Sequence, residues 1–84
     1  MNRAELDRLD LDRALLSAHA DHDLAALVRL YTVAGDRAEA AGDINAACFY
    51  LTHAFVFALE AGAPEAGALN ARLAEHGRAH RLAL

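Results

Sequence analysis

The chain has 84 residues, which is enough for one domain with a small hydrophobic core. Its hydrophobic fraction of 56% includes 22 alanines, and with one proline and five glycines this composition favours an all-helical domain over a sheet. The net charge is -4, and the eight basic residues are scattered arginines, as is typical of a GC-rich bacterial genome. Because phosphate neutralisation needs clustered cations, the sequence disfavours nucleic-acid binding.

The first helix is predicted over residues 4 to 20, where leucines and alanines form two apolar stripes. One stripe holds Leu6, Leu9, Leu16 and Ala20, and the other holds Leu11, Leu15 and Ala18. Residues 1 to 9 are rich in charge and are expected to fray. The same charged start differs from a secretory signal, and a single cysteine fits a reducing compartment, so we expect a cytoplasmic protein.

The next two helices are predicted to form an antiparallel hairpin. Residues 24 to 41 place apolar side chains on one face at helical spacing, after Asp21 or Asp23 as the N-cap. Gly42 and Asp43 then supply a helix C-terminus and an N-cap with almost no linker between them. The third helix is therefore expected from about residue 44 to residue 61.

A fourth helix follows the third after a short turn. Gly62 ends the third helix, and Pro64 fits the first turn of a helix that carries Leu69 and Leu73. Gly77 is expected to weaken or end it, and residues 78 to 84 are expected to fray. The sequence thus predicts one all-α domain over residues 1 to 84, a small antiparallel bundle of about four helices.

The segment "LYTVAGDRAEAAGDINAACFYLTHA" resembles a tetratricopeptide repeat, a helix-turn-helix unit used for protein recognition. The residues that carry the resemblance are Tyr31, Ala34, Gly35, Ala47, Leu51 and Ala54. It covers about residues 28 to 61 as one degenerate unit: the tyrosine expected late in the first helix is Ala38, the closing proline is absent, and no second copy follows. The resemblance implies that a binding groove is lined by Arg29, Thr32, Asp36 and Glu39. Periodicity places these residues on one polar face, which an ordinary solvated helix would also have.

The third predicted helix, in "AACFYLTHAFVFALEAG", is apolar on almost every side. Its polar residues fall within a stripe about 100° wide that also includes Phe49 and Val56. These polar residues are Asn45, Thr52, His53 and Glu60. They interrupt the run of about 20 strongly apolar residues that a membrane span requires, so no span is expected.

Two interpretations account for this apolar helix. Either the first helix and the C-terminal tail cover it, or a protein partner or a second copy of the chain does. We expect that a protein partner or a second copy covers it. The chain would then be a non-catalytic interaction module, either a small accessory or adaptor subunit or a self-associating helical domain. The expected contact residues are Phe49, Val56, Phe57 and His53, with Arg29, Thr32, Asp36 and Glu39 giving orientation.

A metal-binding or sensory domain is the alternative, based on His19 and His22 in "HADHD", with a further His76 and His80 pair at helical spacing. A surface loop whose aspartates cap a helix explains the same loop residues. We expect no cofactor and no catalysis, because Cys48 and His53 diverge by roughly 140° on a helix and no glycine-rich phosphate loop is present.

Overall fold

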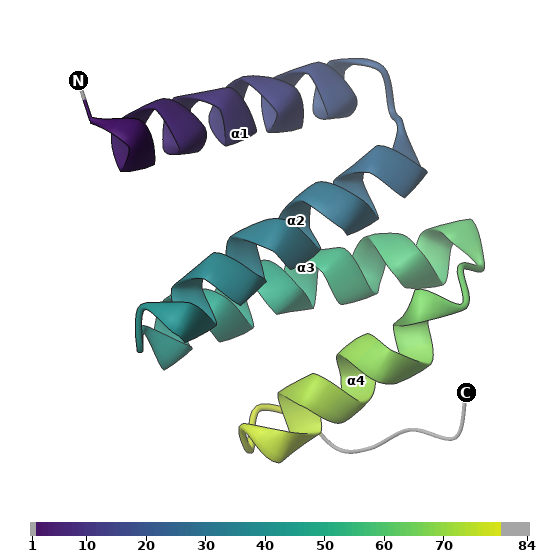
Figure 1. Ribbon diagram of the computed structural model, residues 1–84. Helices are drawn as coiled ribbons and strands as arrows, with labels where there is room; N and C mark the ends of the chain where they lie inside the picture. The colour runs from purple at the N-terminus through teal and green to yellow at the C-terminus, as the bar shows by residue number, and fades with distance from the viewer. Residues whose placement is uncertain (1, 80–84) are drawn as a thin grey trace.

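The computed structural model describes residues 2 to 79 and is all-helical over that part of the chain, without strands. Its four helices are α1 (Arg3–Ala20), α2 (Leu24–Ala40), α3 (Ile44–Ala61) and α4 (Glu65–Glu75) (Figure 1). This confirms the predicted all-α class and the number of helices. Residues 3 to 9, expected to fray, belong to α1, whose first turn is capped by Asn2 through a 2.9 Å hydrogen bond from the Glu5 amide. Most of the C-terminal tail, residues 80 to 84, lies outside the described residues.

Aspartate caps start both helices of the central hairpin. The Asp23 carboxylate accepts a 3.1 Å hydrogen bond from the Ala26 amide, and the Asp43 carboxylate accepts a 3.0 Å bond from the Ala46 amide. Each cap satisfies an amide that has no partner within its helix. These short-range bonds explain why the predicted starts of α2 and α3 agree with the structure.

The first two turns share one backbone geometry. Gly42 has φ +77° and His22 has φ +51°, so both residues occupy the left-handed region after a helix. The next amides, of Asp43 and Asp23, each donate a 2.9 Å hydrogen bond to the helix carbonyl five residues earlier. Because such a turn reverses the chain within a few residues, α1, α2 and α3 run antiparallel in succession.

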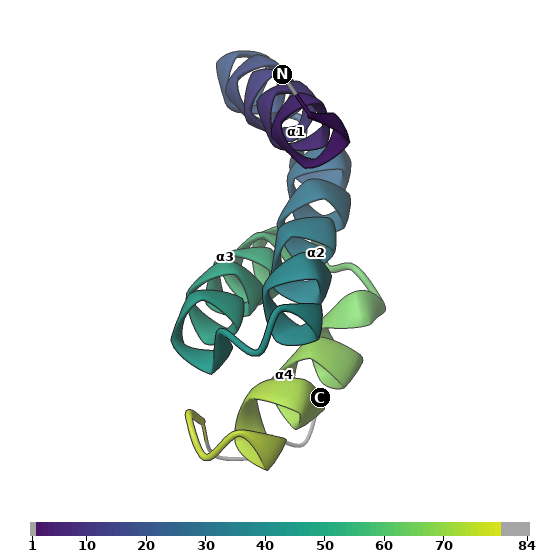
Figure 2. The same ribbon diagram turned by 60° about the vertical axis from the view of Figure 1, so that its left-hand side comes forward.

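The four helices form a flat stack in chain order. The Cα extents are 44 × 31 × 14 Å, so the molecule is much thinner in one direction than in the other two. In the described chain, close backbone contacts join only α1 with α2, α2 with α3, and α3 with α4. Figures 1 and 2 show α1 and α4 at opposite ends of the stack. A stack of this kind leaves helix faces open that a closed bundle would bury.

The main core lies between α2, α3 and α4. Leu51 at its centre is 0% exposed and lies against Gly35 of α2, with Leu69 and Leu73 of α4 in the same cluster. A Cβ atom on Gly35 would lie 2.7 Å from Leu51 Cδ2, closer than side chains tolerate. The absence of a side chain at residue 35 therefore sets how closely α2 and α3 approach.

A smaller cluster joins α1 to α2. Ala18 of α1 is buried there with Ala26 and Leu27 of α2, and Leu15 packs against them. The other predicted stripe of α1 faces away, because Leu6, Leu9 and Leu16 are exposed. Helix α1 therefore buries one stripe against α2, and it contacts α3 through Phe57, which packs against the same cluster.

Candidate functional site

Helix α3 has one buried side and one exposed side. The buried side, which faces α2 and α4, consists of Ala47, Cys48, Leu51, Ala54 and Ala58. The exposed residues on the opposite side, here called the α3 outer face, are Asn45, Phe49, Thr52, Val56, Leu59 and Glu60. Phe49 is 59% exposed, Leu59 47% and Val56 45%. The outer face thus combines large exposed apolar side chains with a few polar ones, a composition typical of protein interfaces.

The two polar side chains at the middle of this surface bond to the backbone of α3 itself. The Thr52 hydroxyl donates a 2.7 Å hydrogen bond to the Cys48 carbonyl, and His53 Nδ1 lies 2.9 Å from the Phe49 carbonyl oxygen. The His53 ring also lies against the Phe49 ring, with centroids 4.6 Å apart. Because the Thr52 hydroxyl and His53 Nδ1 are already paired, covering the surface leaves these two groups satisfied.

A basic side chain borders the N-terminal end of the outer face. The Arg78 guanidinium, beyond α4, donates a hydrogen bond to the Asn45 side-chain oxygen. It also lines an open pocket of about 430 Å³ with Asn45, Cys48, Phe49, Thr52 and His53. Arg78 was not predicted as a site residue, because no local sequence pattern joins residues that are 33 positions apart.

Phe57 lies at the inner edge of the candidate surface. It is half-buried and stacks on Tyr31 of α2 with ring centroids 5.8 Å apart, and it contacts His19 of α1 edge-on. Tyr31 also stacks on His53 and shares a 2.8 Å hydrogen bond with His19 Nε2. Burial, and next the neighbouring Tyr50, raise the pKa of the Tyr31 phenol above its ordinary value. Phe57 thus links three helices, whereas Phe49 and Val56 project outward.

The polar face of α2 is partly used by α4. Arg72 of α4 forms ion pairs with Asp36 at 2.7 Å and with Glu39 at 2.8 Å, and His76 Nε2 lies 2.8 Å from the same Glu39 carboxylate. Thr32 donates its hydroxyl to its own helix at Val28. Of the four groove residues that the resemblance implies, Asp36 and Glu39 contact α4, and Arg29 is exposed.

The contact between Glu39 and α4 predicts a loss of stability in acid. Hydrogen bonds from His76 and then from Arg72 lower the pKa of the Glu39 carboxyl below its ordinary value of 4.5, against the opposing effect of burial. Its stabilising effect is therefore complete above that ordinary value and is lost as the pH falls through the lowered one. Because the pair is partly exposed, we expect an effect of about 1 kcal/mol or less.

The measurement is urea unfolding at neutral pH and at acid pH for the natural chain and for Glu39→Gln. The natural chain should lose more stability on acidification than Glu39→Gln, in which the titrating carboxyl is absent. Glu75→Gln, which changes an exposed carboxylate without an ion pair in residues 2 to 79, is the matched control and should lose as much stability on acidification as the natural chain. Equal acid sensitivity of the natural chain and Glu39→Gln would contradict the assignment.

The predicted metal residues are not brought together. Among residues 2 to 79, no group of three or more His, Cys, Asp and Glu side chains is placed to hold a metal ion. His19 bonds to Tyr31, His22 occupies the left-handed turn position, and Asp23 caps α2. The His80 side chain of the second expected pair lies outside the described residues. No observation favours the metal-binding alternative.

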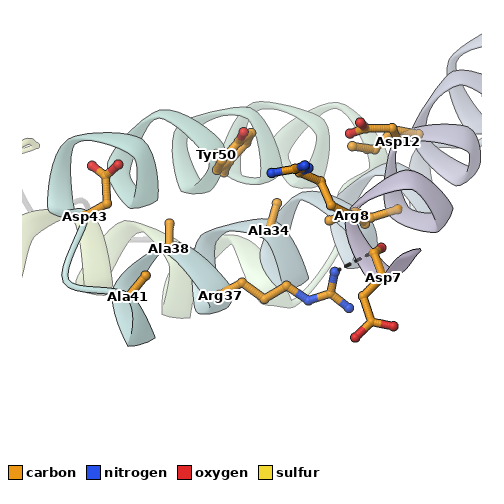
Figure 3. Close-up of a pocket in the computed structure, with 11 residues that line it drawn as sticks. Asp7, Arg8, Asp12, Ala34, Arg37, Ala38, Ala41, Asp43 and Tyr50 are labelled. Atoms are coloured by element: carbon orange, nitrogen blue, oxygen red, sulfur yellow. Dashed lines mark hydrogen bonds between the residues drawn. The ribbon is translucent and has the colours of Figure 1, made fainter. Parts of the chain in front are cut away.

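A larger open pocket of about 710 Å³ lies between α1 and the central hairpin (Figure 3). Alanines of α2 and Tyr50 of α3 line one side, and Asp7, Arg8 and Asp12 of α1 line the other. Arg37 crosses the gap and donates a 3.3 Å hydrogen bond to the Asp7 carbonyl. Charges of both signs alternate around this pocket, so it has no evident preference for a ligand of one charge.

Helix α3 is also long and apolar enough to cross a membrane, and 28% of its residues are buried in the structure. Core helices of soluble proteins meet the same criteria, so this is weak evidence for a span. Comparisons of the chain with protein-family models, with curated proteins and with solved structures found no match.

Proposed function

We propose that this chain is a non-catalytic protein-interaction module whose binding surface is the α3 outer face. The observation that carries the proposal is the exposure of Phe49 and Val56 on a helix whose other sides face α1, α2 and α4. Exposed aromatic and aliphatic side chains bordered by polar groups are typical of the central residues of an interface. The module would serve as a small cytoplasmic accessory or adaptor subunit, or as a self-associating domain.

The hairpin of α2 and α3 supports a tetratricopeptide-like construction in this proposal. Gly35 lies directly against Leu51, and the Ala47 carbonyl oxygen is 3.5 Å from a Cβ built at residue 35. These are positions at which the resemblance implies that the two helices touch. A tight hairpin of this kind holds α3 rigidly, so its outer side chains are presented with little loss of conformational entropy on binding.

The proposal is tested by placing a photo-reactive amino acid at Val56 in the organism that encodes the chain. We expect irradiation to give a discrete cross-linked product, because Val56 is central in the proposed surface. Ala68, an exposed residue of α4, is the control position and should give none. Absence of a product from residue 56, or equal products from both positions, would contradict the proposal.

A further inference from the structure

Four residues of the α3 outer face stand in a two-fold symmetric order, which does not include Leu59. The midpoint of this order lies between Thr52 and His53, the latter at the border of the face. Phe49 and Val56 stand at equal separations on either side of this midpoint. Asn45 and Glu60 stand further out, again at equal separations. A two-fold interface places residue i of one subunit opposite residue j of the other, and j opposite i.

We propose that the occupant of the α3 outer face is a second copy of this chain, paired through antiparallel α3 helices about an axis between Thr52 and His53. This inference rests on the proposed function and names its partner. In this register, Phe49 of each copy packs against Val56 of the other. The Thr52 hydroxyl and His53 Nδ1 are paired within their own helix, so these two groups can be covered at the axis.

Charge complementarity selects the antiparallel direction. Arg78 is held at the N-terminal end of the face by Asn45, and Glu60 stands at the C-terminal end without an ion pair in residues 2 to 79. Antiparallel pairing brings Glu60 of each copy to Arg78 of the other, whereas parallel pairing would set like charges together.

The helix dipole favours the same direction. Glu60 lies in the last turn of α3, where a negative charge is unfavourable next to the negative end of the helix. In the antiparallel pair its carboxylate approaches the positive N-terminal end of the other α3. Because one helix face is a small interface, we expect a dimer with a dissociation constant on the order of micromolar.

The first test is sedimentation equilibrium of the full chain from micromolar to millimolar concentration. The natural chain should dimerise, and Phe49→Glu should remain monomeric while keeping its helical circular dichroism, since this side chain is exposed. The control is Leu16→Glu in α1. Leu16 is more exposed than Phe49 and lies outside the α3 outer face, so this variant should dimerise normally. A monomeric natural chain, or a Phe49→Glu variant that dimerises normally, would overturn the inference.

Charge reversal tests the direction of pairing. Glu60→Arg and Arg78→Glu should each weaken dimerisation by roughly tenfold, because each places like charges together at both ends of the interface. The double variant Glu60→Arg with Arg78→Glu should recover most of the natural affinity. If the loss of dimerisation free energy in the double variant equals the sum of the losses in the two single variants, the antiparallel register is contradicted.

Disulfide trapping tests the axis, with Cys48→Ser as the background. Thr52→Cys should form an intermolecular disulfide on mild oxidation, because residue 52 of both copies lies beside the axis. Glu60→Cys should not, since in this register the two residues are separated by about 22 Å along the helices. Parallel pairing would place each residue opposite its own copy, so a disulfide at residue 60 would indicate parallel pairing and overturn the inference. The absence of a disulfide at residue 52 would also overturn it.

The mass of the product photo-cross-linked at Val56 separates this inference from the proposed function. A product of twice the 9.0 kDa chain mass supports the homodimer. If the only product has a different mass, the proposed function stands and the homodimer is overturned. No product contradicts both.

Discussion

Leu51→Ala is expected to lower the free energy of unfolding by about 3 to 5 kcal/mol. Leu51 is 0% exposed and lies where α2, α3 and α4 meet, so truncation removes buried apolar contacts and leaves a cavity. A domain of this size has a total stability of about 5–15 kcal/mol, so a large part would be lost. Urea unfolding followed by circular dichroism measures the change.

The control for this prediction is Leu16→Ala, the same substitution at a leucine that is 70% exposed. Because little apolar area is buried there, we expect a change within about 0.5 kcal/mol. Equal effects at the two positions would show that Leu51 is not at the centre of the core.

Gly35→Ala is expected to destabilise the chain by about 1 to 3 kcal/mol. In an open helix the same change stabilises by up to about 1 kcal/mol, because alanine restricts the unfolded backbone and favours helix. Here the added Cβ would lie 2.7 Å from Leu51 Cδ2 and 2.8 Å from Leu51 Cγ, inside a core that cannot move freely. The steric cost should outweigh the gain in helix propensity.

The matched control is Gly67→Ala in α4, where no heavy atom lies within 4 Å of the added Cβ and where we expect stabilisation. A double-mutant cycle identifies the cause. In the Leu51→Ala background the added methyl has room, so Gly35→Ala should become neutral or stabilising. An unchanged cost in that background would mean that another contact is responsible.

Local signals explain why the helices could be predicted closely. Asp23 and Asp43 cap the starts of α2 and α3, and Gly62 ends α3. The hydrogen bonds at these helix ends join residues at most five positions apart, so the residue types that make them can be recognised in the sequence. The fourth helix begins at Glu65, directly after its cap residue Pro64, which the sequence placed in the first turn. The all-α class followed from the same short-range patterns.

The candidate surface was predicted only in part. Helical periodicity placed Phe49 and Val56 on the polar stripe of the third helix, and both are exposed there. The predicted contact residues also included Phe57, which periodicity does not place on that stripe, and its ring turns toward Tyr31 and His19. Periodicity gives the angle of a side chain around its own helix, but not which neighbouring helix lies at that angle.

The sequence by itself determined the four helices, their turns and the polar and apolar sides of each, because these depend on caps and spacing within a few residues. Only the tertiary structure decided which stripe of α1 packs on α2, that Asp36 and Glu39 hold α4, and that Arg78 reaches Asn45. These contacts join distant parts of the chain, and their choice depends on the shape of whole packed surfaces. The exposure of the α3 outer face follows from that choice, since α1 docks on α2 and leaves the face open.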